Sequence, residues 1–216
     1  MNSTDTRLPA ALADGNGSTR LRAALAIGSS PDPRFVDALI ARCALEPDFF
    51  VRDMLTWALT RFPSELTVPK LVAELRSDVG QARSQALHTL SKIKDGSAFP
   101  AITQSLLRDA DDEVARSAWR AAVALVADGQ KRELAEELAT QLGRGSRDVQ
   151  LSLSRALVAL GADVVEPVLR KAMTDGAPGV RAHASATERL LNDTDAGFKL
   201  AVDEARRQFA LKDRPA

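Results

Sequence analysis

Residues 78–93 read DVGQARSQALHTLSKI, and residues 111–126 read DDEVARSAWRAAVALV. Both stretches begin with an aspartate, reach an Ala-Arg pair within a few residues, and continue with small or apolar residues at helical spacing. Related pairs recur along the chain, at Leu21-Arg22, Val51-Arg52, Ala82-Arg83, Ala115-Arg116, Val149-Gln150 and Val180-Arg181. The second members of these pairs lie 30, 31, 33, 34 and 31 residues apart. A period of this length is typical of repeat arrays, in which each unit covers the apolar face of its neighbour.

The recurrence predicts one repeat domain over residues 1–216, with no linker that separates two domains. Residues 1–20 are expected to form a partly disordered N-terminal cap around one short helix, and residues 21–192 the repeats. Residues 193–216 should hold a capping helix and a loose tail, because apolar side chains follow one helical face there, at Phe198, Val202, Ala205 and Phe209.

Turn signals divide the repeats into helices. Helices are expected at 49–62, 68–75, 81–93, 101–107, 114–126, 133–142, 149–160, 164–173 and 180–191. Pro63 and Pro69 are placed in the connection between the first two, or in a first helical turn, where proline is tolerated.

Composition narrows the function. Lysine and arginine total 29, as do aspartate and glutamate, so no global basic excess favours nucleic acid or anionic lipid as a partner. No apolar run approaches the roughly 20 residues that span a bilayer, and residues 1–20 lack the pattern of a secretory signal, so we expect a cytoplasmic protein. Cys43 is the single cysteine and lies in an apolar stretch, which predicts a buried thiol. We expect no metal and no cofactor.

The Val-Arg pair, the small residues after it and the aspartate before it resemble HEAT repeats, and in particular the short HEAT-like units of phycobilisome lyase proteins. The resemblance covers about residues 21–191 and is strongest in the two stretches quoted above. It implies an all-α, right-handed α-solenoid of about six stacked two-helix repeats, with the second helix of each unit lining the concave face. Tetratricopeptide repeats fit less well because their signature includes a tyrosine, which this chain lacks.

The recurring arginines form a column whose structural members are Arg22, Arg52, Arg83, Arg116 and Arg181, with Gln150 as the exception. Arg52 and Arg116 follow Asp48 and Asp112 by four residues, so their guanidinium groups are expected to bridge acidic turns within and between units. Direct contact with a partner is the second interpretation of the column.

Positions outside the repeat core are the candidate partner-binding residues. They are Asp53, Met54, Trp57, Arg61, Gln85, His88, Lys92, Arg120, Ser152, Arg155 and His183. Trp57 is either an interface anchor or a packing residue, and both interpretations stay open. Trp119 falls in the core column and should be buried, whereas His88 and His183 are expected to be lone surface residues.

The pattern contains no catalytic motif, so the favoured hypothesis is a non-enzymatic scaffold or adaptor that binds a protein segment in its concave groove. Arg120, Arg155 and Lys92 give that groove a basic lean, which favours an acidic segment or helix as the partner. One alternative is a HEAT-like DNA-binding alkylpurine DNA glycosylase, with Trp57 and Asp53 among its candidate residues. Another is a bilin lyase-like chaperone, which rests on the resemblance of the repeat unit alone. The oligomeric state and the pathway are not predicted.

Overall fold

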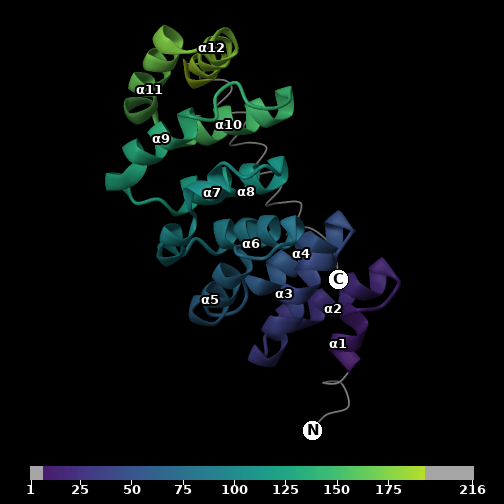
Figure 1. Cartoon of the computed structure of the whole chain (residues 1–216). Coiled ribbons are helices and arrows are strands. Elements are labelled where there is room, and N and C mark those ends of the chain that lie inside the picture. The colour runs from purple at the N-terminus through teal and green to yellow at the C-terminus, as the bar shows by residue number, and fades with distance from the viewer. Residues whose placement is uncertain (1–6, 193–216) are drawn as a thin grey trace. The chain divides into compact units, whose positions relative to one another are not determined.

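The computed structural model describes residues 7–192, which form helices joined by short turns and contain no strand (Figure 1). The α-helices are α1 (Arg7–Leu12), α2 (Gly17–Ser29), α3 (Val36–Leu45), α4 (Phe49–Leu59), α5 (Ser64–Glu74), α6 (Gly80–Ile93), α7 (Gln104–Leu107), α8 (Asp112–Leu125), α9 (Lys131–Ala139), α10 (Arg147–Leu160), α11 (Ala162–Asp175) and α12 (Pro178–Asn192). Three short 3₁₀ helices join them, η1 (Pro33–Phe35), η2 (Gly96–Ala101) and η3 (Asp128–Gln130). The predicted capping helix in 193–216 lies outside the described residues.

The chain divides between Gln130 and Lys131 into two compact units. In unit 1, the helices that carry the arginine column pack on one another in chain order, α2 on α4, α4 on α6 and α6 on α8. The intervening helices form a second layer, with α1 on α3, α3 on α5 and α5 on η2 (Figure 1). Each hairpin therefore adds one helix to each layer, which is the arrangement of an all-α repeat fold.

Unit 2 repeats the arrangement on a smaller scale. Helix α10 packs on α12 and α9 packs on α11, while α11 also packs on α12. The two-layer order that the sequence period predicts thus holds inside each unit, and the prediction of an all-α repeat fold is confirmed.

The core consists of the positions that the helical period turns toward the second layer. Leu55 and Leu59 of α4, and Leu87 and Leu90 of α6, are at most 1% exposed. Trp119 of α8 is fully buried, as predicted, and its indole Nε1 donates to the Leu107 carbonyl at 2.8 Å. That hydrogen bond satisfies the one polar atom of the largest buried side chain.

The second layer departs from prediction in the third repeat. The helix expected over 101–107 is shortened to the four residues of α7, because η2 ends at Ala101 and α7 begins only at Gln104. Pro100 lies inside η2 and has no N–H to extend a helical hydrogen-bond ladder through this segment. Helix α5 is longer than the predicted helix over 68–75, because it begins at Ser64. Pro69 therefore lies inside the helix, and its ring is exposed to solvent.

Candidate functional site

The arginine-column helices of unit 1 each turn one side away from the second layer. Because successive helical residues are rotated by about 100°, positions 2, 6, 9 and 13 after each N-cap share this side. The N-caps are Asn16, Asp48, Val79 and Asp111. We call the surface the outer face; it comprises Ser18, Arg22, Leu25, Ser29, Phe50, Met54, Trp57, Arg61, Gln81, Gln85, His88, Lys92, Glu113, Ser117, Arg120 and Ala124, of which only Ser117 is buried.

Apolar side chains gather on the outer face over α2 and α4. Leu25 is 42% exposed and Phe50 is 64% exposed, and Met54 and Trp57 continue the line along α4 as half-buried side chains. An apolar stripe on neighbouring parallel helices is the kind of surface that receives an amphipathic helix.

Trp57 is a packing residue that also contributes to this stripe. Its ring lies against Gly28 of α2, where an added Cβ would come within 2.8 Å of the ring Cε3 and 2.9 Å of the Ala58 Cα. The Arg61 guanidinium sits over the ring, with its Cζ 5.9 Å from the centroid. The absence of a side chain at Gly28 therefore lets α2 and α4 approach closely around Trp57, and leaves the ring half-buried.

Asp53 and His88 come together across α4 and α6, with 3.9 Å between Oδ1 and Nε2. This is a contact between adjacent repeats at the border of the outer face, and it is an ion pair only when His88 is protonated. The prediction of His88 as a lone residue is therefore wrong, since it has an acidic neighbour.

Cations outnumber anions on the outer face. Arg22, Arg61, Lys92 and Arg120 are exposed. Glu113 is its one carboxylate, and Glu113 accepts from Arg116 Nη1 at 2.7 Å. The Arg120 Nη2 lies 3.0 Å from Ser117 Oγ. The surface around the apolar stripe therefore carries a local positive charge on a chain that is neutral overall.

In unit 2, Ser152 is half-buried and Arg155 is exposed on α10. His183 of α12 is only 4% exposed, so the expectation of a surface residue is wrong. Its ring is bonded to α10 and to the turn before α10, and a residue so placed is not available to a partner.

Most arginines of the column hold the turn that precedes their own helix. Arg52 Nη1 donates to the carbonyl oxygens of Glu46 and Pro47, both at 2.8 Å, and not to Asp48. Arg83 and Arg181 likewise donate to the carbonyls of Ser77 and Gly176. Gln150 does the same through its amide, at 3.4 Å from the Gly143 oxygen and 3.3 Å from the Gly145 oxygen. The glutamine that interrupts the column thus keeps its contact.

The column is shifted by one or two residues in two helices. In α2 the turn is held by Arg20, which donates to the carbonyls of Asp14 and Gly15, while Arg22 points to the outer face. In α8 the position four residues after the N-cap is Ala115, so Arg116 pairs with Glu113 instead. Bridging of an acidic turn between repeats does occur at Arg83, whose Nη2 lies 3.1 Å from Asp109 Oδ2.

The turn before α4 is the feature that the sequence reading missed. Glu46 is fully buried, receives both Nε and Nη2 of Arg20 at 2.7 Å, and also receives Nε of Arg42 at 2.8 Å. Burial would raise the pKa of Glu46, but the hydrogen bonds outweigh it and lower the pKa to about 2. Gln81 binds the Glu46 carbonyl from the next repeat at 2.9 Å.

On top of this held turn lie Leu45, Phe49 and Phe50, which are 70%, 61% and 64% exposed. The two phenylalanine rings meet edge to face at 5.7 Å between centroids, and the Arg52 guanidinium covers Phe49. The sequence could have indicated this exposed pair, because both phenylalanines directly follow the N-cap aspartate and precede Val51, the first buried residue of α4. The exposed aromatic pair extends the apolar stripe of the outer face at Phe50.

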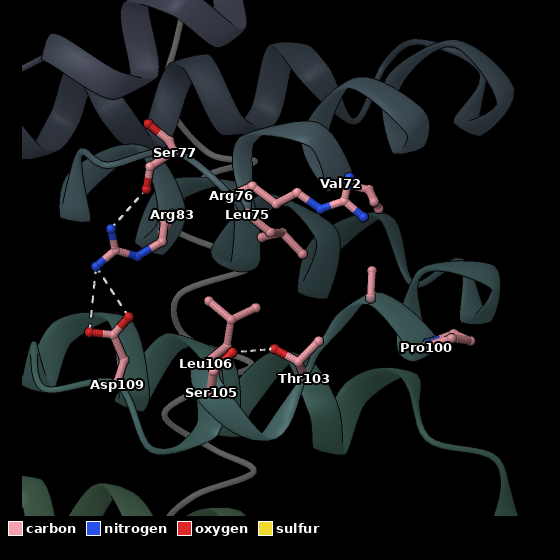
Figure 2. A pocket seen from close by; sticks show the side chains of 11 residues that line it. Val72, Leu75, Arg76, Ser77, Arg83, Pro100, Thr103, Ser105, Leu106 and Asp109 are labelled. Carbon is pink, nitrogen blue, oxygen red and sulfur yellow. Dashed lines mark hydrogen bonds and ion pairs between the residues drawn. The ribbon is translucent and has the colours of Figure 1, made fainter.

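A cavity of about 430 Å³ opens where the second layer is broken, between α5 and the η2–α7 segment. Figure 2 shows Arg83 at its edge, bonded to Asp109 and to the Ser77 carbonyl, and Thr103 bonded to Ser105. The Nε of Arg83 has no hydrogen-bond partner among the described residues. The cavity lies where the helix of the second layer is interrupted. The charges of Arg83 and Asp109 at its edge pair with each other.

Comparison with known proteins identifies the first repeats. The profile of the HEAT-repeat family matches residues 4–83. This confirms the sequence resemblance for that stretch, and the all-α repeat order extends through both units. No curated protein matches the chain in sequence. No helix within residues 7–192 is long and apolar enough to cross a membrane.

Two solved structures are similar to the chain at low sequence identity. One is the complex of CpcE and CpcF of phycocyanin lyase from Nostoc sp. PCC7120, with 22% identity, a TM-score of 0.49, and coverage of 88% of this chain and 78% of that chain. The other is an engineered protein, with 18% identity, a TM-score of 0.48, and coverage of 88% of this chain and 99% of that chain. At these values neither neighbour informs the function.

Proposed function

We propose that the protein is a non-enzymatic interaction scaffold whose outer face in unit 1 binds an acidic amphipathic segment of another protein. The observation that carries the proposal is the apolar stripe of Leu25, Phe50, Met54 and Trp57, bordered by exposed cations. HEAT repeats are stacked helices that offer extended surfaces to other proteins, which supports the class of function.

The apolar part of the surface supplies the affinity. Phe50 and Leu25 are exposed large side chains on neighbouring helices, and Met54 is a flexible side chain suited to an adaptable contact. The turn below Phe50 is fixed by the Glu46 hydrogen bonds, so little ordering is required when a partner binds. A preorganised apolar surface of this kind favours a helix docked by its apolar side.

The charges supply the choice of partner. Arg22 is exposed on α2, one turn before Leu25, and Arg61 is exposed just after α4, one turn beyond Trp57. Complementary charges raise association rates and exclude partners of like charge. A segment with glutamates or aspartates on its polar side therefore fits better than a basic one.

The nucleophiles that the structure does describe argue for a non-enzymatic role. Burial raises the pKa of the Cys43 thiol to about 12, which keeps it protonated at neutral pH. Ser154 lies 3.0 Å from His183 Nε2, but both residues are about 95% buried. No arrangement of the described residues favours the DNA glycosylase or the bilin-attachment hypothesis. A cytoplasmic location is part of the proposal and is checked by cell fractionation.

The direct test uses a synthetic amphipathic peptide with glutamates on its polar side, and a twin with lysines at the same positions. Trp57 reports on the outer face, whereas the buried Trp119 gives a constant background. We expect the glutamate peptide to change the fluorescence of wild type, to leave Trp57→Phe unchanged, and to bind about tenfold or more tightly than its twin. Equal binding of the two peptides would refute the charge argument, and no binding of either would refute the site.

A second experiment identifies the natural partner. Affinity purification is carried out with wild type, with Arg22→Glu/Arg61→Glu, and with the matched control Arg132→Glu/Arg170→Glu, whose arginines are exposed in unit 2. A protein recovered by wild type and by the control, and lost with the outer-face variant, supports the proposal. If the three proteins recover the same partner equally well, the binding site lies outside the outer face.

A further inference from the structure

His183 lies in the interior of unit 2, where three segments meet. It belongs to α12, and its ring contacts α10 and the turn that joins α9 to α10. The Gly143 N–H donates to Nδ1 at 2.9 Å. Nδ1 must therefore carry a lone pair, which places the ring proton on Nε2.

The Nε2 side of the ring is matched to that tautomer. Nε2 lies 3.0 Å from the Gln150 carbonyl oxygen and 3.0 Å from Ser154 Oγ, so its N–H has acceptors within reach. Ser154 Oγ continues the chain to Thr187 Oγ1 at 2.7 Å, and Thr187 Oγ1 donates back to the His183 carbonyl at 2.9 Å. Every polar atom of the cluster has a partner when the imidazole is neutral.

Among residues 7–192, the groups bonded to the ring carry no charge. The groups that face it are the Gly143 amide from the turn, Gln150 and Ser154 from α10, and Thr187 from α12 itself, and none of these titrates. None of these described partners is a carboxylate that could pair with a buried imidazolium.

The turn that His183 holds depends on that contact. Gly143 and Gly145 adopt φ of 83° and 70°, a left-handed backbone that glycine alone adopts readily. The Gln150 side chain binds the carbonyl oxygens of both glycines, and His183 binds the Gly143 amide from the other side. A proton on Nδ1 would set two N–H donors against each other at this point.

We propose that His183 is an acid-sensitive latch, which in its neutral form holds the α9–α10 turn against α12 and on protonation releases it. The latch is independent of the proposed binding face, which belongs to unit 1. Its consequence is local opening of unit 2 at acid pH, while unit 1 keeps its structure.

The direction follows from linkage. Burial lowers the pKa of His183 from its ordinary value of 6.5, and the Gln150 carbonyl only partly opposes that shift. A histidine whose pKa is lower in the folded than in the unfolded state stabilises the fold fully above pH 6.5, and this contribution is lost as the pH falls through the folded value.

The test is site-resolved because the chain has two histidines. Amide hydrogen exchange of Gly143 is measured from about pH 7.5 to about pH 5, after correction for the intrinsic rate, in wild type, His183→Asn and His88→Asn. Asparagine places an amide oxygen near the position of Nδ1, accepts from the Gly143 N–H and does not titrate. We expect protection of Gly143 to fall about tenfold at the acid end in wild type and in His88→Asn, and to stay constant in His183→Asn.

A second measurement on wild type stands if His183→Asn does not fold. Nitrogen NMR of the imidazole should show a protonated Nε2 and a bare Nδ1 at neutral pH, and the Gly143 amide resonance should shift with the same midpoint as the ring. Constant protection of Gly143 in wild type would overturn the proposal. So would a ring that titrates at or above pH 6.5 while the Gly143 resonance does not move.

Discussion

Glu46→Gln is expected to destabilise unit 1 strongly, although it replaces only one carboxylate oxygen with an amide NH2 group. The Glu46 side chain has no exposed area, the Arg20 side chain is 7% exposed, and the two are joined by paired 2.7 Å hydrogen bonds. The pKa of Glu46 falls from an ordinary 4.5 to about 2, a difference of about 2.5 units. At about 1.4 kcal/mol per unit this corresponds to about 3–4 kcal/mol of stability at neutral pH. Removing one partner of a buried ion pair costs about 3–5 kcal/mol by mutation, so the two magnitudes agree.

The assay is urea unfolding followed by Trp119, which is buried in unit 1 and reports on that unit in the full chain. The stabilisation from a carboxylate with a lowered pKa is present above pH 4.5 and is lost as the pH falls toward 2, so the gap between wild type and Glu46→Gln should narrow across that range. Asp37→Asn is the control, because its ion pair with Lys70 is exposed and should be worth less than about 1 kcal/mol. A cost of Glu46→Gln below about 1 kcal/mol at pH 7, or a gap that does not change with pH, would refute the reasoning.

Three further outcomes are expected. Gly28→Ala should cost about 1–3 kcal/mol in urea unfolding, because the new Cβ meets the Trp57 ring and the Ala58 backbone; an unchanged midpoint would contradict the close approach of α2 and α4. Cys43 should resist a thiol reagent at about pH 8 until the chain unfolds, since its pKa is about 12; labelling of the folded protein at the rate of a free thiol would contradict the burial. Trp119→Phe should lower thermal stability by about 1–3 kcal/mol because the Leu107 carbonyl loses its donor, and an equal loss in the half-buried Trp57→Phe would show that the hydrogen bond is not the cause.

The fold could be predicted from the sequence where helix capping and the periodicity of apolar residues indicate the same helix. Asp48 and Asp111 cap helices whose apolar positions then follow the helical period, so both the start and the buried side of α4 and α8 could be predicted. Trp119 could be placed in the core because it falls in a column of small and apolar residues. Period and capping give the same answer at these positions.

Prediction failed where long-range contacts decide. In the sequence, Leu21-Arg22 resembles the other Val-Arg pairs. In the structure, however, it is Arg20 that donates to the carbonyl oxygens of Asp14 and Gly15 in the turn before α2. The burial of His183 depends on Gly143, 40 residues earlier, which no periodic pattern connects to it. The outer face itself could be predicted from the helical period, but the packing of Trp57 on Gly28 could not, because it depends on the distance between two helices.

The displaced arginine of α2 bears on the proposed function. Where Arg52, Arg83 and Arg181 donate to turn carbonyls, their charges are used to hold the fold. In α2 that task is met by Arg20, so Arg22 is an additional cation at an exposed position beside the apolar stripe. The same substitution at the two positions distinguishes a role in the fold from a role in binding. Arg20→Lys should lower the stability of unit 1, because lysine cannot pair with Glu46 through two hydrogen bonds. Arg22→Lys should leave the stability unchanged. If Arg22→Lys lowers stability as much as Arg20→Lys does, Arg22 has a structural role, and its charge is no longer evidence for an acidic partner.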